Sequence, residues 1–518
     1  MIEVTNRREM RNASGWGWLK SGLPAFMLSI IAMMILSGCC SNPPEQVDIT
    51  ETDADIETDA DNRPPPGFSP ANDYFLKANP FLNSCYCVDL DIAPDGSIYS
   101  MGIYEDTIQF GQYELEYTEE EADTEHRFIC KFDAAGSVVW VKEIDNRLHD
   151  RDFDISRIDY LKACNDNSVV VMGYIFPEEP FEDADNYNVS SCPSLVFLIK
   201  YNEMGDVLWD RVLGGYAYTL PYGDLDVGSD GSIYILGLSE DGNAWVEGET
   251  ILERENSSSR PFIWKFDADG NLVWKEIMTY TNYGTMLTSI RVKDNLILLT
   301  GEFTNTLDFD PGPGVSEITS SGGDDALLLI LNTHGVFQCV YGFGYKEGDD
   351  IFYECCSDNN GNYYACGESY IPNNDLEIVQ AGWITKFNNT GVVEWNKYIG
   401  AGVGGRILRI KYLNDSTILV FGRSHNQFQF IEGNEVTTSL RDIFIARFDE
   451  NGQWLGALNW PLPQYRMGYT DVILGHNGNI YCQGYCRDNA VFQEIEFTEG
   501  VQLVEEIYGL VLNIQLDQ

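Results

Sequence analysis

A hairpin motif that recurs along the chain constrains its fold more than any other feature of the sequence. In the clearest copy, Phe262 to Lys275 reads FIWKFDADGNLVWK, an apolar run, a turn signal that ends in glycine and a second apolar run that carries tryptophan. Two such runs around a glycine-containing turn predict a β-hairpin. The other copies begin at Phe128, Phe197, Leu328, Trp383 and Phe444.

A second motif alternates with the first and consists of an apolar strand, a turn and an apolar strand that ends in glycine. Its first copy, DLDIAPDGSIYSMG, ends at Gly102. The later copies end at Gly173, Gly237, Gly301, Gly367, Gly422 and Gly484. Each unit therefore holds two hairpins, whose strands we name A, B, C and D in chain order. Units of about 60 residues with four strands are typical of a β-propeller rather than a solenoid.

The count of strands predicts how the fold closes. Strands A, B and C each occur seven times, the last C strand being Leu510–Leu516, whereas strand D occurs six times. The segment Tyr74–Lys77 precedes the first A strand and matches D strands such as Trp274-Lys275. We therefore expect an all-β fold in which residues 72–518 form a seven-bladed β-propeller of four-stranded antiparallel blades. The N-terminal strand would complete the last blade, so that no sheet edge stays open across the ring.

The same residues resemble a known repeat family. The hairpin motif in every unit, and GEFTNTLDFDPGPG at Gly301–Gly314 followed by SGGDDALLLILNTHG, resemble the seven-bladed β-propeller repeats (SBBP repeats) of bacterial secreted and lipoprotein chains. The DFDPGPG element departs from a full repeat pattern, because it occurs once, at Asp308–Gly314. The resemblance implies the fold, and it implies no particular reaction, because this family is a scaffold class without a shared activity.

The first 38 residues are predicted to be a lipoprotein signal peptide. A basic segment precedes an apolar stretch at 23–36, which is too short to span a bilayer comfortably. The stretch ends in Leu36-Ser37-Gly38-Cys39, which resembles the bacterial lipobox and implies acylation of Cys39 and anchoring in a lipid bilayer. The alternative is an ordinary secretory signal in which Cys39 is incidental. Because the next residue is not Asp, analogy with enteric bacteria favours the outer membrane, on either its periplasmic or its surface face.

Residues 39–71 are predicted to be an acidic, proline-rich tether, because such a segment repels itself and cannot bury a core. The whole chain carries a formal net charge of -49, which argues against nucleic acid as a partner. The charge favours solubility or, alternatively, attraction of cations or basic partners. No dinucleotide fingerprint, P-loop or nucleophile-elbow motif occurs in the sequence. We expect a monomer without a cofactor.

Several residues are of types that bind metals or catalyse reactions, but their positions in the sequence fit structural roles. The acids Asp226, Asp230, Asp267, Asp269 and Asp449 are interpreted as turn residues rather than calcium ligands. The recurring tryptophans are interpreted as core, the five histidines as surface or turn residues, and several of the 13 cysteines as buried thiols. An exported chain permits disulfides, but the sequence does not name pairs. Asp308 and Asp310 are the better metal candidates, though weak ones, because prolines hold their backbone rigid.

The loops predict where a ligand would bind. The A–B and C–D turns are short, whereas the B–C and D–A connections are long and rich in aromatic residues. Variable loops on a rigid scaffold commonly carry binding sites. The expected platform for a glycan or an extended protein segment consists of Tyr218, Tyr222, Tyr280, Tyr283, Tyr345 and Tyr469. The favoured hypothesis is a non-catalytic binding scaffold of the cell envelope. The alternatives are a polymer-acting hydrolase or lyase with its site at the channel mouth, and a structural envelope component.

Overall fold

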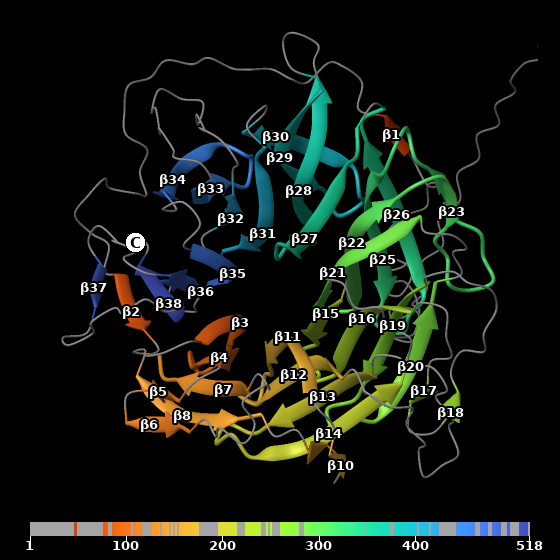
Figure 1. Ribbon diagram of the computed structural model, residues 1–518. Helices are drawn as coiled ribbons and strands as arrows, with labels where there is room; N and C mark the ends of the chain where they lie inside the picture. Colours follow the sequence, from red (N-terminus) through yellow and green to blue (C-terminus); the bar gives the residue numbers. More distant parts are fainter. Residues whose placement is uncertain are drawn as a thin grey trace, which may run out of the picture. The chain divides into compact units, whose positions relative to one another are not determined.

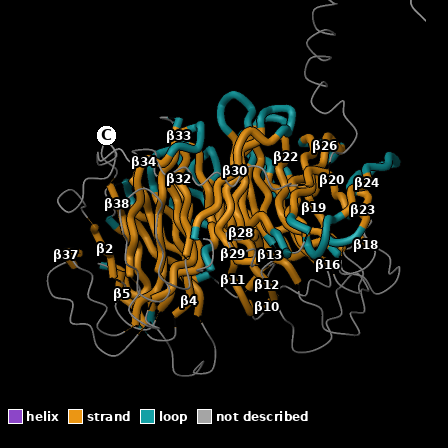
Figure 2. The backbone as a smooth tube through the Cα atoms, turned by 90° about the horizontal axis from the view of Figure 1, so that it is seen from above, coloured by secondary structure: helices purple, strands orange, loops and turns teal. Residues whose placement is uncertain are grey.

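A computed structural model shows an all-β, propeller-like arrangement (Figures 1 and 2). It describes residues 46–48, 76–80, 85–104, 107–110, 112–116, 126–134, 137–144, 147–148, 151–152, 155–175, 195–214, 223–239, 245–246, 249–250, 260–278, 284–346, 348–372, 378–400, 404–413, 416–423, 442–461, 467–474, 479–487, 495–497 and 507–515. The chain divides into two compact units, 1–41 and 42–518, and the described residues belong to the second. Every regular element among them is a β-strand, and they contain no helix that could cross a membrane.

The main sheets follow one another in chain order, and each is built from antiparallel neighbours. The first contains β3 (Cys85–Ile92), β4 (Ile98–Tyr104), β7 (His126–Phe132) and β8 (Val138–Glu143). The next contains β11 (Ile155–Ala163), β12 (Val169–Ile175), β13 (Leu195–Tyr201) and β14 (Val207–Gly214), extended by β17 (Trp245–Val246) and β18 (Glu249–Thr250). It is followed by β15 (Asp224–Val227), β16 (Ile233–Ser239), β19 (Arg260–Phe266) and β20 (Leu272–Ile277).

The second half of the chain repeats this architecture. The fourth sheet contains β21 (Thr285–Lys293), β22 (Leu296–Phe303), β25 (Asp325–Asn332) and β26 (Phe337–Gly344). The fifth contains β27 (Ile351–Ser357), β28 (Tyr363–Pro372), β29 (Ile378–Phe387) and β30 (Val393–Ile399). The sixth contains β31 (Arg406–Tyr412), β32 (Thr417–Arg423), β33 (Asp442–Asp449) and β34 (Trp454–Pro461). The C-terminal sheet contains β35 (Met467–Leu474), β36 (Asn479–Arg487) and β38 (Ile507–Gln515). The predicted A, B, C and D strands are therefore present in this order.

Short strands supplement these sheets. The antiparallel pairs are β5 (Ile108–Phe110) with β6 (Tyr113–Leu115), β9 (Arg147–Leu148) with β10 (Arg151–Asp152), and β23 (Thr306–Asp308) with β24 (Glu317–Thr319). Strand β1 (Gln46–Asp48) pairs in parallel with β26. Strand β2 (Leu76–Pro80) pairs antiparallel with β38 and in parallel with β37 (Ile495–Phe497). Tyr74 and Phe75 of the predicted strand lie outside the described residues, and the neighbour of β2 is the last C strand, as predicted.

The tight turns have the predicted geometry. Gly270 has a φ of +79°, and its N–H donates to the carbonyl oxygen of Asp267 at 3.1 Å. The Asp267 carboxylate accepts hydrogen bonds from the N–H groups of Asp269 and Asn271. Glycine tolerates a positive φ without steric cost, and a side-chain acceptor at the first position fixes the turn. The interpretation of Asp267 as a structural turn residue is confirmed.

The second recurring glycine has a different role from the predicted strand end. Gly301 and Gly367 lie inside β22 and β28, opposite an irregularity in the neighbouring A strand. A Cβ on Gly301 would lie 1.9 Å from the carbonyl oxygen of Met286, and one on Gly367 would lie 1.8 Å from that of Ile351. The B strand therefore continues past the glycine, which is required because a bulge brings the A-strand backbone too close for any side chain.

The A strands lie innermost in Figure 1 and connect the sheets to one another. From β3 the contacts run through β11, β15, β21, β27 and β31 to β35, and β35 also contacts β3. The B strands pack on both faces, as predicted, because Ile233, Tyr234, Ile235 and Leu236 are all buried. Buried clusters join neighbouring sheets, as where β12 and β13 pack on β16 and β19. The core therefore lies between the sheets.

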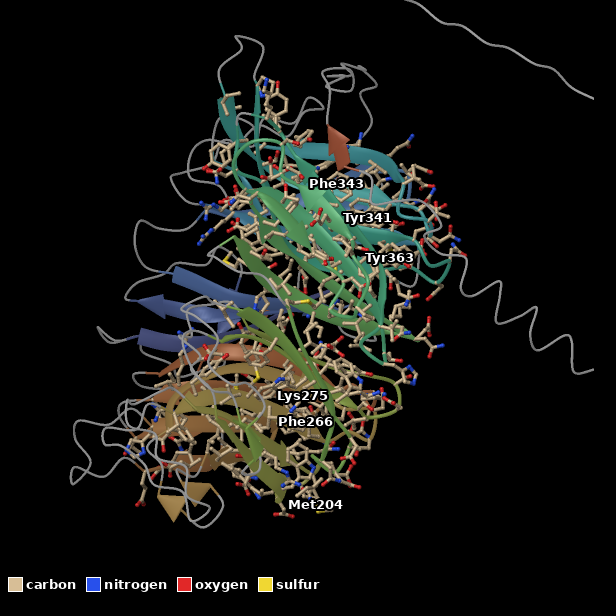
Figure 3. The ribbon with its side chains drawn as sticks, turned by 90° about the vertical axis from the view of Figure 1, so that its right-hand side faces the viewer. Met204, Phe266, Lys275, Tyr341, Phe343 and Tyr363 are labelled. Atoms are coloured by element: carbon tan, nitrogen blue, oxygen red, sulfur yellow. The ribbon has the colours of Figure 1, made fainter. Side chains whose placement is uncertain are left out.

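The recurring tryptophans link each sheet to the next. Trp274 Nε1 donates to the carbonyl oxygen of Thr333 at 3.0 Å, in the C–D turn of the following sheet. Trp140, Trp209 and Trp395 make the same contact with Glu203, Ala268 and Glu450. On β26, where Cys339 occupies the tryptophan position, Tyr341 Oη instead donates to Thr390 O at 2.9 Å (Figure 3). These rings pack at seams between sheets, which agrees with a structural role and refines the predicted core position.

Candidate functional site

The strand directions define two faces of the described sheets. Because neighbouring strands are antiparallel, the A–B and C–D turns lie on one face, which we call the short-turn face. The B–C and D–A connections lie on the other, which we call the long-loop face. Each A strand therefore begins at the long-loop face and ends at the short-turn face.

A cavity of about 460 Å³ lies between A strands of six successive sheets, β3, β11, β15, β21, β27 and β31. Its acidic lining residues are Asp89, Asp91, Asp159, Asp224 and Glu354. Its basic lining residues are Arg157, Lys162, Arg291, Arg409 and Lys411. Several of these side chains directly follow the A-strand bulge, including Asp89, Glu354 and Arg409. The bulge turns these side chains toward the cavity.

The charges of the cavity wall alternate from sheet to sheet. Lys162 Nζ lies 3.6 Å from Asp91 Oδ2 and 3.5 Å from Asp226 Oδ1, so one ammonium bridges carboxylates of the sheets on either side. These two acids stabilise the ammonium, and the pKa of Lys162 is raised although burial opposes its charge. Asp226 was expected in a turn, but it lies inside β15 and is buried. That part of the turn interpretation is wrong, because the carboxylate faces the neighbouring sheets.

Glu354 is the centre of a second ionic group. Its side chain is only 1% exposed, and its Oε1 pairs with Arg291 Nη2 and lies 3.5 Å from Lys411 Nζ. Arg291 Nη1 also lies 2.6 Å from Asp224 Oδ2. Burial by itself would raise the pKa of Glu354, but Lys411, Arg291 and Arg409 outweigh it and hold that pKa well below its usual range. Glu354 is therefore ionised at neutral pH.

The same carboxylates also connect backbones of neighbouring sheets. Asp226 Oδ2 accepts the N–H of Val292 at 2.6 Å, and Glu354 Oε2 accepts that of Ile410 at 2.8 Å. Asp89 Oδ2 accepts the N–H of Leu161 at 2.5 Å in the same way. Charge-assisted bonds to backbone N–H groups are stronger than neutral ones. The ionic lining of the cavity therefore helps to hold the sheets together.

A second acidic group lies at the long-loop face between the β21–β26 sheet and the β27–β30 sheet. Glu302 lies near the end of β22, Asp324 directly precedes β25, Asp349 precedes β27, and Glu368 follows the recurring glycine of β28. Burial, and then repulsion from Asp324, Asp349 and Glu368, raises the pKa of Glu302 to about 7. Among these carboxylates, Glu368 has a basic partner, Arg406, at 2.6 Å. This group can donate as well as accept hydrogen bonds near neutral pH.

Tyr345 lies beside this acidic group. It occupies the D–A connection between β26 and β27, as predicted, and is half-buried. Its N–H donates to Asp350 Oδ2 at 2.7 Å, which ties the connection to the start of β27. Asp350 is fully buried, and burial raises its pKa to about 7. The backbone that carries the ring is therefore held in place.

The structure does not describe the side chains of the other tyrosines in the predicted binding platform. Tyr218, Tyr222, Tyr280 and Tyr283 lie outside the described residues, and Tyr469 lies in β35, of which only the backbone is described. Cys39 also lies outside the described residues. The platform and the lipid attachment therefore remain predictions.

Asp308 and Asp310 shape a turn in the structure. Asp308 Oδ1 accepts the N–H groups of Asp310 and Ser316, and Asp310 Oδ1 accepts that of Gly312. In the described part of the chain no group of acids, histidines and cysteines is arranged to hold a metal ion. Cysteines 87, 130, 164, 339, 355, 356 and 366 form no disulfide, and all but Cys356 are buried. Burial raises the pKa of Cys164 to about 11.

One histidine differs from the expected surface or turn position. His126 begins β7 and is buried, and its Nδ1 lies 2.7 Å from Glu143 Oε1 on β8. His334 lies in the C–D turn between β25 and β26, as predicted. These contacts are structural.

Comparisons with known proteins give no family assignment. No family model matches the sequence, and no curated protein matches it. Among solved structures, a mutant of Synechocystis apocarotenoid oxygenase is similar, with 12% identity, a TM-score of 0.36, and coverage of 78% of this chain and 88% of that chain. The polysaccharide lyase Uly1 has 9% identity and a TM-score of 0.42, covering 83% and 90%. A mutant NanB sialidase from Streptococcus pneumoniae has 11% identity and a TM-score of 0.36, covering 84% and 68%. Scores this low carry no inference about activity.

Proposed function

We propose that this protein is a non-catalytic binding scaffold of the bacterial cell envelope, built on a seven-bladed β-propeller that β2 closes. The register of β2 against β38, from Lys77 opposite Asn513 to Pro80 opposite Leu510, supports the closure. The contacts that run from one A strand to the next and from β35 to β3 support the ring. Acylated Cys39 anchors the scaffold, as a monomer, in the outer membrane. The support for the anchor is the lipobox-like Leu36-Ser37-Gly38-Cys39.

The ligand is a glycan or an extended protein segment bound at the long-loop face. The observation that carries this proposal is the position of Tyr345, half-buried on a fixed connection at the same face as Glu302, a partly exposed carboxyl whose pKa is about 7. An aromatic ring offers apolar area at low entropic cost. Carboxyls that both donate and accept hydrogen bonds suit a ligand rich in hydroxyl or amide groups. The long-loop face therefore combines the two features that such a ligand needs.

Alanine substitution at the predicted platform tests the assignment. The variants are Tyr345→Ala and the combination of Tyr218→Ala with Tyr280→Ala, each measured for binding to a panel of envelope polysaccharides and extended peptides. Loss of large side chains at the centre of a contact surface should weaken binding by about 1–3 kcal/mol. Thermal unfolding should be nearly unchanged for Tyr345→Ala, because its ring is only half-buried.

The short-turn face provides the matched control. Asp269 is exposed in the turn between β19 and β20, on the opposite side of the sheets, and Asn389 occupies the equivalent turn between β29 and β30. Asp269→Ala and Asn389→Ala should leave binding unchanged. If these substitutions abolish binding and the tyrosine substitutions do not, the binding face is wrongly assigned.

A polymer-acting hydrolase or lyase is the second candidate function. Glu302, whose pKa is about 7, favours it, because a partly exposed carboxyl that keeps its proton near neutral pH can act as a general acid. If the chain cleaves an envelope polysaccharide, Glu302→Gln should abolish cleavage and leave binding intact. Absence of any cleavage by the unmodified chain would favour the binding scaffold.

A further inference from the structure

The short-turn face combines the entry side of the N-terminal strands with exposed apolar side chains. We propose that this face lies against a zwitterionic lipid bilayer, so that the long-loop face is directed away from the membrane. The inference rests on the anchored scaffold proposed above, and it adds to the acyl anchor a contact between the folded chain and the bilayer surface. Strand direction, the distribution of apolar residues and the local charges support it.

The directions of the first two strands place the entry of the chain at the short-turn face. Strand β2 is antiparallel to β38, a C strand that ends at this face, so Leu76 is the end of β2 nearer to it. Strand β1 is parallel to β26, a D strand that begins at this face, so Gln46 is likewise the nearer end of β1. The chain therefore enters both strands from the short-turn side. A covalent anchor upstream of them allows a contact that is too weak to hold a free protein to persist.

Exposed apolar side chains gather on the same face. In the described part of the chain eight large hydrophobic residues are exposed, and seven of them lie in C–D turns or at the start of D strands. The exception is Val315, on the B–C connection of the fourth sheet. Single exposed apolar residues scattered over a surface are normal, whereas their concentration on one face marks an interaction site. The seven come from five successive sheets and include Val139, Met204, Leu208, Val273, Val336 and Val392.

Packing does not require apolar residues at these positions. In β8, Trp140 is 7% exposed at the seam, whereas Val139, which points to the opposite side of the strand, is 42% exposed. In the fifth sheet the residue before the seam tryptophan Trp395 is Glu394, which is exposed. A charged side chain is therefore compatible with the fold at the position of Val139. The exposed valine is available for a contact outside the chain.

Local ion pairs reduce the negative charge of the turns on this face. Asp95, Asp166 and Asp230 in A–B turns lie 3.8, 3.7 and 3.9 Å from the Nζ atoms of C-strand lysines. In a C–D turn, Asp206 lies 3.1 Å from Lys142 Nζ of the preceding sheet. The chain as a whole still carries a formal charge of -49, which anionic lipid would repel. The charges therefore favour a zwitterionic surface.

A bilayer fits this arrangement better than a second copy of the chain. The apolar residues belong to five successive sheets, so a partner that contacts them together has to be broad. A second copy would bring the same excess of acid to the interface, which opposes association. A bilayer surface is broad, and its interfacial region accepts apolar side chains from a protein that does not span it.

Radical footprinting of the full chain tests the contact. The protein is purified from cells, returned to phosphatidylcholine vesicles and oxidised with hydroxyl radicals, alongside the same protein without vesicles. Met204, marked in Figure 3, is 67% exposed, and a thioether oxidises readily. In vesicles the oxidation of Met204 and Val336 should fall, whereas that of Val315 at the long-loop face should not change. Equal oxidation of Met204 with and without vesicles, or protection of Val315 alone, overturns the proposal.

Matched substitutions on the fourth sheet then identify the face. Val336→Asp places a charge in the C–D turn and Val315→Asp places one in the B–C connection; both valines are exposed, so both variants should fold. Val336→Asp should weaken the contact about threefold to tenfold and restore the oxidation of Met204 in vesicles. Val315→Asp should leave Met204 protected. Equal effects of the two substitutions, or protection that increases when phosphatidylglycerol is added, contradict the proposal.

The footprint is independent of how the chain is anchored. If Met204 is protected but the chain carries no acyl group, the anchor assignment fails and the bilayer contact stands. If the chain is acylated but Met204 is not protected, the anchor stands and the contact fails. Protection of Met204 that occurs without vesicles and disappears on dilution would assign the face to a second copy of the chain and overturn the proposal.

Discussion

Glu302 and Glu354 show how surroundings move the pKa of the same side chain in opposite directions. Glu302 is partly buried among Asp324, Asp349 and Glu368, and its pKa rises from 4.5 to about 7. Glu354 is fully buried, but Lys411 and Arg291 hold its pKa below the ordinary 4.5. Burial opposes ionisation at both positions, so the sign of the nearest charges decides the outcome.

These shifts predict opposite effects of pH on stability. The folded state holds the Glu302 proton more tightly than the unfolded state, so its contribution is fully present below pH 4.5 and is lost as the pH rises through about 7. The contribution of Glu354 is present above pH 4.5 and is lost as the pH falls below that value. We therefore expect both contributions to favour the folded state together at about pH 5.

Glutamine substitutions separate the two contributions. Relative to the unmodified chain, Glu302→Gln should gain free energy of unfolding between pH 5 and pH 7, with a slope of at most about 1.4 kcal/mol per pH unit. Glu354→Gln should lose about 3–5 kcal/mol at pH 7, because Arg291 and Lys411 lose a buried partner, and this loss should shrink in acid. Urea unfolding across the pH range measures both, and a pH-independent difference for either variant would contradict its assignment.

At the scale of single elements, the β2 strand connects the two ends of the described fold. Its residues pair with β38 from Lys77 to Pro80. A chain that starts at Phe81 would lack this strand and expose one edge of β38, and we expect it to unfold at a lower temperature, with a loss of several kcal/mol. A chain that starts at Asn72 removes the signal and tether but keeps β2, and it serves as the control. Equal melting temperatures for the two chains would rule out the closure.

The strands and turns follow from local sequence patterns, whereas the cavity does not. Apolar runs around a glycine turn specify a hairpin within about 14 residues, so Phe262–Lys275 predicts its own structure. Asp91, Lys162, Asp226 and Arg291 alternate in charge, but they form ion pairs only because successive A strands lie side by side in the fold. A comparison of equal positions in successive units would have revealed this alternation. The same comparison would not predict the bulge before Glu354, because the bulge depends on how the backbone of β27 pairs with β28.

At the scale of the whole molecule, the paired charges of the cavity contrast with the large negative charge of the chain. The formal net charge is -49, yet the cavity lining has equal numbers of acids and bases. Five of the 32 lysines and arginines line the cavity, where they balance its acids, so the excess acid lies outside this lining. An excess of negative charge keeps a displayed protein soluble and weakens its attraction to anionic surfaces. If the chain is the envelope scaffold proposed above, it would rely on a covalent anchor.

That anchor is predicted to be Cys39, and the adjacent Cys40 offers a matched control. In cells fed a labelled fatty acid, the unmodified chain should incorporate label and fractionate with membranes, because two or three acyl chains bind a bilayer firmly. Cys39→Ser should abolish labelling and release the protein or mislocalise it, whereas Cys40→Ser should behave like the unmodified chain. Both substitutions replace a thiol with a hydroxyl at neighbouring positions, so a difference between them isolates the acylated residue. If label persists in Cys39→Ser, or disappears in Cys40→Ser, the assignment of Cys39 as the acylated residue is wrong.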